Sequence, residues 1–98
     1  MKSFNLTLEI PKNFQMTQYN CWEHFIIRGA NTIYKDGIDI KTSRRINKIL
    51  DLIEKSNGSV ELEDADFEIV KNIVDRGKFD AQLRLVVEQI AKSVEDAK

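Results

Sequence analysis

The chain is poor in the residue types on which much familiar protein chemistry depends. Its 98 residues include one cysteine, one histidine, one proline and one tryptophan. A single cysteine cannot form an internal disulfide, which is typical of proteins from a reducing compartment. The first ten residues also lack the basic and apolar regions of a signal peptide. We therefore expect a cytoplasmic protein.

The common catalytic and cofactor motifs are also missing. The sequence has no glycine-rich phosphate loop, no dinucleotide fingerprint and no nucleophile elbow. Cys21 and His24 form a C-x-x-H pair, but a structural zinc site needs about four ligands, and no further Cys or His is present. A catalytic thiol would need an orienting group and an oxyanion site, which the sequence does not identify. We predict a non-enzymatic protein without metal or cofactor.

Long apolar runs and a large net charge are absent as well. No apolar run approaches the roughly 18–20 residues of a membrane span, so we expect no membrane partner. The formal net charge is −1. Residues 1–55 contain nine Lys or Arg and six Asp or Glu, whereas residues 56–98 contain six and ten. This division predicts a mildly basic half and an acidic half.

What the chain does contain is typical of one folded domain. Hydrophobic residues make up 42% and charged residues 32%, and the length supports a single core. We therefore predict one domain over residues 1–98. The low number of glycines and prolines favours long regular elements joined by short turns.

The first half of the chain predicts a strand followed by two helices. Residues 4–10 alternate between apolar and polar types, as in a half-buried strand. Thr17 is predicted to cap a helix that Gly29 ends. A short strand is expected at 38–40. The clearest helix follows at 43–56, because its apolar residues recur at i, i+3, i+4 and i+7.

The second half predicts one more strand and two helices. A short strand is expected around 60–62, followed by a helix that Asp64 or Asp66 caps and Gly77 ends. In the last helix we expect residues 92–98 to fray. The predicted order is β-α-(β)-α-β-α-α, an α+β fold with a two- or three-stranded sheet packed against three to four helices.

The segment 14–34 holds five of the eight aromatic residues. It has more apolar side chains than one helix face can bury. Either this helix is buried on most sides, or part of it contacts a partner protein or a second copy of the chain. The candidate partner-binding residues are Tyr19, Trp22, Phe25 and Ile26.

The helix at 43–56 has a basic side opposite its apolar side. A basic stripe near a helix N-terminus is suited to phosphate contacts. The same stripe could instead face an acidic protein surface, or simply solvent. The residues of this basic side are Lys41, Arg44, Arg45, Lys48 and Lys55.

An acidic run lies at the start of the following helix, without the spacing of an EF-hand. Carboxylates stabilise a helix N-terminus through capping and the helix dipole. The alternative is an acidic surface for a basic partner. The run consists of Glu61, Glu63, Asp64, Asp66 and Glu68.

Residues 60–71 resemble a pattern found in small phage and prophage proteins, in which a short strand leads into an acidic cap and an amphipathic helix. The resemblance implies an accessory role, such as virion assembly or inhibition of a host enzyme by binding, and it identifies no functional residue. We therefore predict a protein-binding module, of the phage accessory type. The alternative is a nucleic-acid-binding protein that uses the basic side of the helix at 43–56.

Overall fold

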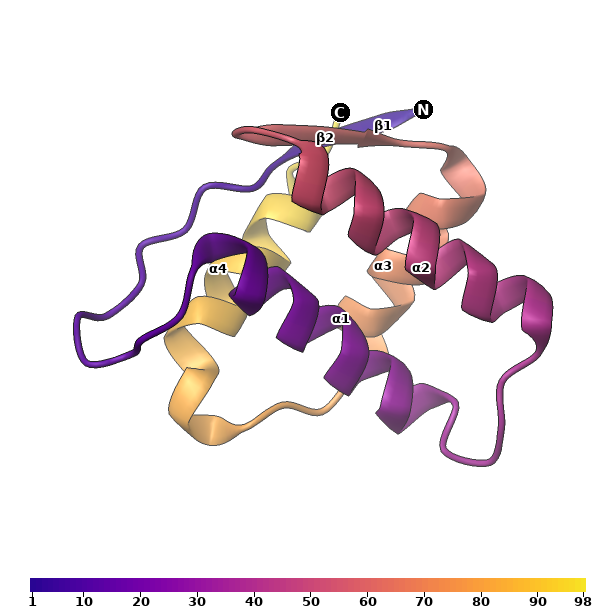
Figure 1. Ribbon diagram of the computed structural model, residues 1–98, viewed down its shortest axis with the longest axis horizontal. Helices are drawn as coiled ribbons and strands as arrows, with labels where there is room; N and C mark the ends of the chain where they lie inside the picture. The colour runs from indigo at the N-terminus through magenta and orange to yellow at the C-terminus, as the bar shows by residue number, and fades with distance from the viewer.

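The computed structural model describes all 98 residues and contains two strands and four α-helices (Figure 1). The predicted α+β fold and the predicted order of its main elements are confirmed. A short 3₁₀ helix, η1, precedes the last α-helix. The elements are β1 (Lys2–Asn5), α1 (Gln18–Ile33), α2 (Ile40–Lys55), β2 (Ser59–Leu62), α3 (Asp64–Arg76), η1 (Ala81–Leu83) and α4 (Arg84–Glu95).

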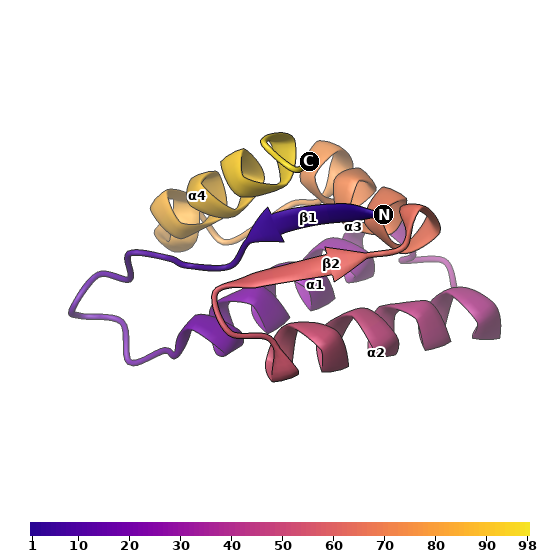
Figure 2. The same cartoon turned by 90° about the horizontal axis from the view of Figure 1, so that it is seen from above.

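The two strands form an antiparallel sheet that lies over the helices (Figures 1 and 2). Phe4 of β1 stands opposite Val60 of β2. Both side chains are buried, whereas Ser59 and Glu61 are exposed. The alternation along the strands therefore gives the sheet one face toward the core and one toward solvent.

Strand β1 is shorter than the predicted strand at 4–10. The chain turns at Gly58, which has φ of +94°, so β2 offers no partner beyond this point. The following segment is held by side chains instead. The backbone N–H of Leu8 donates to Oε1 of Gln18 at 3.2 Å, and that of Glu9 donates to Oε1 of Gln89 at 2.8 Å.

Helix α1 begins as predicted and ends later than predicted. Thr17 is its N-cap, and its Oγ1 accepts from the backbone N–H of Asn20 at 3.0 Å. Gly29 does not end the helix, which continues to Ile33. The glycine lies instead against Ile73 of α3, where its missing side chain allows the two helices to approach.

Helix α2 includes the end of the segment predicted as a strand at 38–40. Asp39 caps the helix, and its Oδ1 accepts from the backbone N–H of Thr42 at 2.7 Å. The hydrogen bonds from Thr42 lower the pKa of the Asp39 carboxyl. The helix therefore starts at Ile40, three residues before the predicted start of 43–56.

The C-terminal part of the chain is tied to β1. Helix α3 ends at Gly77 as predicted. Helix α4 continues to Glu95, and Val94 is buried. The backbones of Ser3 and Lys98 exchange two hydrogen bonds of 3.1 and 3.0 Å. The C-terminal residue is therefore hydrogen-bonded to β1, and the fraying predicted for residues 92–98 stays a prediction.

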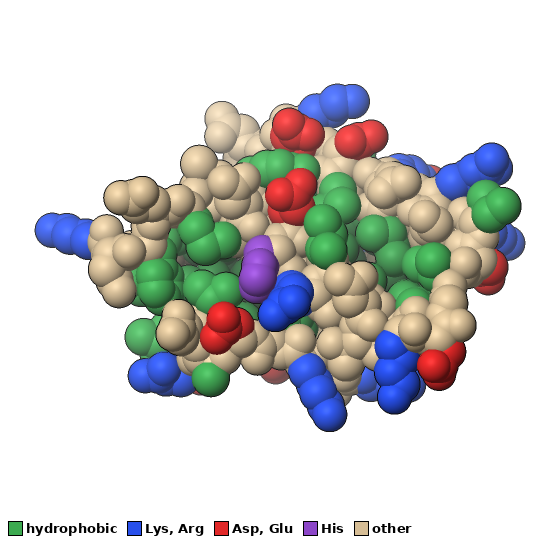
Figure 3. Space-filling model, turned by 60° about the horizontal axis from the view of Figure 1, so that its bottom comes forward, with side chains coloured by type: hydrophobic (Ala, Val, Ile, Leu, Met, Phe, Trp, Pro, Cys, Tyr) green, Lys and Arg blue, Asp and Glu red, His purple; other side chains and the backbone are tan.

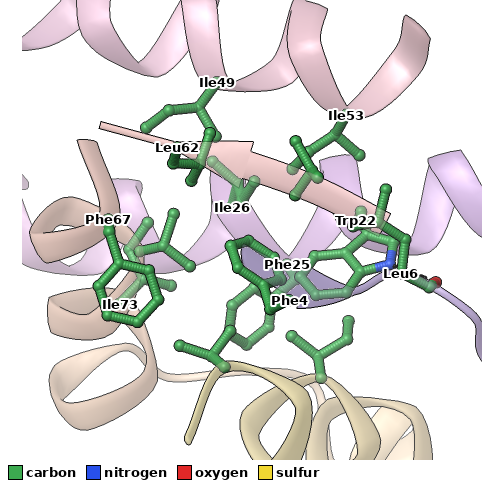
Figure 4. Close-up of a cluster of buried hydrophobic side chains, with 14 of the residues drawn as sticks. Phe4, Leu6, Trp22, Phe25, Ile26, Ile49, Ile53, Leu62, Phe67 and Ile73 are labelled. Atoms are coloured by element: carbon green, nitrogen blue, oxygen red, sulfur yellow. Dashed lines mark hydrogen bonds between the residues drawn. The ribbon is translucent and has the colours of Figure 1, made fainter. Parts of the chain in front are cut away.

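The core lies between the sheet and the four helices, and every α-helix and both strands contribute to it. Figure 4 shows side chains from α1, α2 and α3 meeting Phe4 and Leu62 of the two strands. None of the helices combines the length and the hydrophobicity needed to cross a lipid bilayer. Central members of the core are Phe4, Leu6, Trp22, Phe25, Ile26, Ile49, Ile53, Leu62 and Ile73.

Candidate functional site

Three of the four predicted partner-binding residues are core residues. Trp22, Phe25 and Ile26 are each at most 1% exposed. Nε1 of Trp22 donates to the carbonyl of Leu6 at 2.8 Å (Figure 4), and the ring of Phe25 stacks on Phe79 with centroids 4.6 Å apart. These three side chains offer no surface to a partner, so their prediction as partner contacts is corrected to a core role.

Tyr19, the fourth predicted residue, is only partly buried. Its hydroxyl donates to Oε2 of Glu23 at 3.2 Å. Desolvation and this hydrogen bond raise the pKa of the Tyr19 phenol. The negative charges of Asp51 and Glu54 raise it further. Tyr19 therefore lies where α1 meets the C-terminal half of α2, among carboxylates.

The outer side of the α1–α2 hairpin carries most of the exposed apolar side chains. Ile27 is 41% exposed, Ile38 44% and Ile40 70%. Together with Tyr19 they define what we call the hairpin face. Figure 3 shows apolar side chains in a broken band across the underside of the molecule, where α1 lies. The sequence did not identify Ile27 as exposed, because helical periodicity does not reveal which side of α1 is left uncovered. Ile38 and Ile40 were predicted to belong to a short strand.

Three carboxylates near Tyr19 have no basic partner. The four ion pairs of the molecule involve the N-terminus, Arg45 and Lys48 as the cations. Glu23, Asp51 and Glu54 take part in none of them. The hairpin face thus carries exposed isoleucines from the middle of α1 to its turn and, around Tyr19 at its other end, three carboxylates without an ion-pair partner.

Two residues of the predicted basic side of α2 are engaged inside the molecule. Nη1 of Arg45 lies 2.9 Å from Oδ1 of Asp66, which is fully buried. Nζ of Lys48 lies 3.2 Å from Oε1 of Glu63 and 3.3 Å from Oδ2 of Asp66. The hydrogen bonds to these two carboxylates raise the pKa of the Lys48 ammonium. This network ties α2 to the start of α3.

Four of the five predicted basic residues lie together. A cavity of about 390 Å³ is lined by four cations and one carboxylate. Lys41 and Arg44 take part in no ion pair. Lys55 stands apart in the last turn of α2. The residues around the cavity are Lys41, Arg44, Arg45, Lys48 and Glu63.

The predicted acidic run does not form one surface. Asp64 pairs with the N-terminal amino group at 3.2 Å, and Asp66 is buried in the network described above. Neither residue is the cap of α3, because Glu63 occupies that position. Sequence reasoning missed the buried role of Asp66. A signal was present, since Asp66 stands at helical spacing from the core residues Val70 and Ile73.

The Cys21–His24 pair has no further ligand beside it. Cys21 is buried, and desolvation raises the pKa of its thiol. The Nε2 atom of His24 is buried without a hydrogen-bond partner. No group of three or more His, Cys, Asp or Glu side chains is arranged to hold a metal ion. The geometry therefore gives no support to a thiolate nucleophile or a metal centre at this pair.

Known proteins offer no guide to these surfaces. No protein-family model, curated protein or solved structure matches the chain. The resemblance of residues 60–71 to phage proteins therefore stays a prediction, and the function has to be inferred from the surfaces of the molecule.

Proposed function

We propose that the protein is a non-enzymatic binding module that contacts another protein through the hairpin face. The observation that carries this proposal is the exposure of Ile27, Ile38 and Ile40 on one helical hairpin. Ile27 lies on α1, Ile38 in the connection and Ile40 at the start of α2, and exposed apolar surface on one supersecondary unit is characteristic of protein–protein contacts. A phage accessory role, by binding to a host enzyme or an assembly partner, is the setting that residues 60–71 suggest.

The charges of the hairpin face define the chemistry of this partner. Glu23, Asp51 and Glu54 have no counter-ion within the chain. A partner surface with an apolar centre and a basic rim would cover the isoleucines and compensate these carboxylates. Complementary charge of this kind sets the orientation and association rate of a complex more than its final affinity.

The double variant Ile27→Ser/Ile40→Ser tests the hairpin face. Because both side chains are exposed, the free energy of unfolding should change by less than about 1 kcal/mol. Proteins captured from host lysate by the wild-type chain are purified, and their affinity for each variant is measured by calorimetry. We expect the double variant to bind at least about tenfold more weakly.

The matched control is Leu85→Ser on α4, because Leu85 is 59% exposed and lies outside the hairpin. It should retain the affinity of the wild-type chain. Equal affinity of both variants for the captured protein would show that the hairpin face is not the contact surface. Sedimentation equilibrium of the free chain separately reports whether the partner is a second copy.

Nucleic-acid binding is the second candidate, and the unpaired Lys41 and Arg44 at the 390 Å³ cavity favour it. Fluorescence titration with DNA and RNA at two salt concentrations tests it. If the function is protein binding, we expect no salt-dependent affinity for DNA or RNA. Phosphate contacts would instead give a nucleic-acid affinity that falls steeply as the salt concentration rises. The suitable variant is Lys41→Glu/Arg44→Glu. Substitution of Arg45 would also break its ion pair with Asp66 and confuse binding with stability.

A further inference from the structure

The outer edge of β1 is hydrogen-bonded to the C-terminal residue. This pairing shows which backbone groups of β2 point outward at the opposite edge of the sheet. Ser3 of β1 exchanges two backbone hydrogen bonds with Lys98, so its N–H and C=O groups point away from β2. Ser3 stands opposite Glu61 in the register. In an antiparallel ladder this is a non-hydrogen-bonded pair. The N–H and C=O groups of Glu61 therefore point away from β1.

Ser59 is also in a non-hydrogen-bonded pair. It stands opposite Asn5, whose carbonyl accepts a hydrogen bond from the hydroxyl of Ser93 rather than from β2. The backbone N–H of Leu6 donates to the carbonyl of Gly58 at 2.8 Å, which agrees with this alternation. Ser59 and Glu61 thus each present one N–H and one C=O at the outer edge of β2, where no other strand pairs with them.

This edge lacks most of the features that protect an exposed strand. Natural edge strands are commonly protected by short length, charged side chains, proline, a bulge, an inward-pointing charge or a covering segment. Strand β2 has the first two, with four residues and the exposed Glu61. Strand β2 contains no proline, its register with β1 is continuous, and its inward residues are Val60 and Leu62. A further strand could therefore pair with β2 without rearrangement of the sheet.

Helix α2 carries a row of basic side chains below this edge. Figures 1 and 2 show α2 running below β2 and extending beyond it on the open side. Lys48 contacts Glu63, the residue after β2, so the side of α2 that carries Lys48 faces the end of the strand. Lys41, Leu52 and Lys55 share this side, because they recur at helical spacing from Lys48.

The positive charge of these α2 lysines is only partly compensated within the chain. Lys41 and Lys55 take part in no ion pair. The cavity bounded by Lys41, Arg44 and Glu63 lies past the end of β2. A strand beside β2 would direct alternate side chains toward α2. Acidic side chains at these positions would meet the lysines, and a carboxylate beyond the paired residues would reach the cavity.

We propose that the open edge of β2 binds an extended acidic segment of a partner protein as a third strand. Backbone hydrogen bonds to Ser59 and Glu61 provide sequence-independent affinity, as in other cases of strand addition. Lys41 and Lys55, which take part in no ion pair, select segments with acidic side chains on the face toward α2. This site is separate from the hairpin face and would serve a second contact.

Two short synthetic peptides test the proposal on the full chain. One alternates glutamate with threonine, and the other alternates lysine with threonine. We expect the glutamate peptide to bind at least about tenfold more tightly. Hydrogen–deuterium exchange by NMR should show that it protects the amides of Ser59 and Glu61, which are free in the unbound chain.

N-methylation of the glutamate peptide separates strand addition from charge attraction. Methyl groups on the amides that face β2 remove the backbone hydrogen bonds and should abolish binding, whereas methyl groups on the alternate amides should leave it nearly unchanged. Equal effects of both methylation patterns would overturn the proposal. Equal affinities of the glutamate and lysine peptides would overturn it as well.

Charge variants test the role of the α2 lysines in binding the peptide. Lys41→Glu/Lys55→Glu should weaken the glutamate peptide at least about tenfold. The matched control, Lys12→Glu/Lys92→Glu, makes the same charge change beside a different cavity and should have little effect. Tighter competition by single-stranded DNA than by the peptide would instead assign the site to nucleic acid. If the amides of Ser59 and Glu61 became more protected from hydrogen exchange as the protein concentration rose without peptide, the edge of β2 would be a contact with a second copy of the chain.

Discussion

Replacement of Trp22 by alanine is expected to lower the free energy of unfolding by about 3–5 kcal/mol. The indole is fully buried, and its ring centroid lies 5.6 Å from that of Phe4 and 6.4 Å from that of Phe25. Removal of the ring leaves a cavity among aromatic side chains that can close only in part. It also leaves the carbonyl of Leu6 without its hydrogen bond, which adds to the loss.

Urea denaturation followed by circular dichroism measures this change. Trp22→Phe is the matched control, because it keeps an aromatic ring and removes only the N–H donor and part of the volume. It should destabilise the protein by about 1–3 kcal/mol, less than the alanine variant. Since Trp22 is the only tryptophan, its fluorescence in the wild-type chain should also be blue-shifted until the protein unfolds. A loss below about 1 kcal/mol in Trp22→Ala would place the residue at the surface instead.

The fold was predictable wherever one local signal decided the outcome. Helix α2 follows from the spacing of Ile46, Ile49 and Ile53, all of which are buried. The start of α1 follows from Thr17, whose side chain can accept a backbone N–H in the first turn. In each case the signal lies within about two turns of helix, so neighbouring residues carry the necessary information.

The prediction for α1 failed where the outcome depended on other helices. The sequence left two alternatives for its excess of apolar residues, burial on most sides or a partner surface. In the structure α1 packs against α2, α3 and α4, so Trp22 and Phe25 point into the core. Ile27 lies on the side that remains uncovered. No periodicity within α1 distinguishes these sides, because the distinction depends on which helices pack against it.

The candidate sites show the same limit. The basic side of α2 was predictable from helical geometry, but the pairing of Arg45 with Asp66 depends on contact between residues far apart in the chain. The open edge of β2 could not have been predicted from the sequence. It follows from the register that places Ser3 opposite Glu61 and from the pairing of Ser3 with the C-terminal residue.

Replacement of Gly29 by alanine is expected to lower the free energy of unfolding by about 1–3 kcal/mol. Helix propensity alone predicts the opposite sign, because alanine stabilises a helix by roughly 1 kcal/mol relative to glycine. In this helix, however, a Cβ at position 29 would overlap the Cγ2 methyl of Ile73 and lie 3.2 Å from its Cβ. Since Ile73 is fully buried, it has little room to move, and overpacking should outweigh propensity.

A double-mutant cycle identifies the overlap as the cause. Ile73→Leu removes the Cγ2 methyl, so it should recover part of the loss in Gly29→Ala, with a coupling of about 0.5–3 kcal/mol. Ile73→Val keeps this methyl and should recover little. The exposed Asn31→Ala on the same helix reports propensity alone and should be neutral or slightly stabilising. Equal stabilities of Gly29→Ala and Asn31→Ala would show that α1 and α3 are not in close contact at this point. The prediction that α1 ends at Gly29 would then stand again.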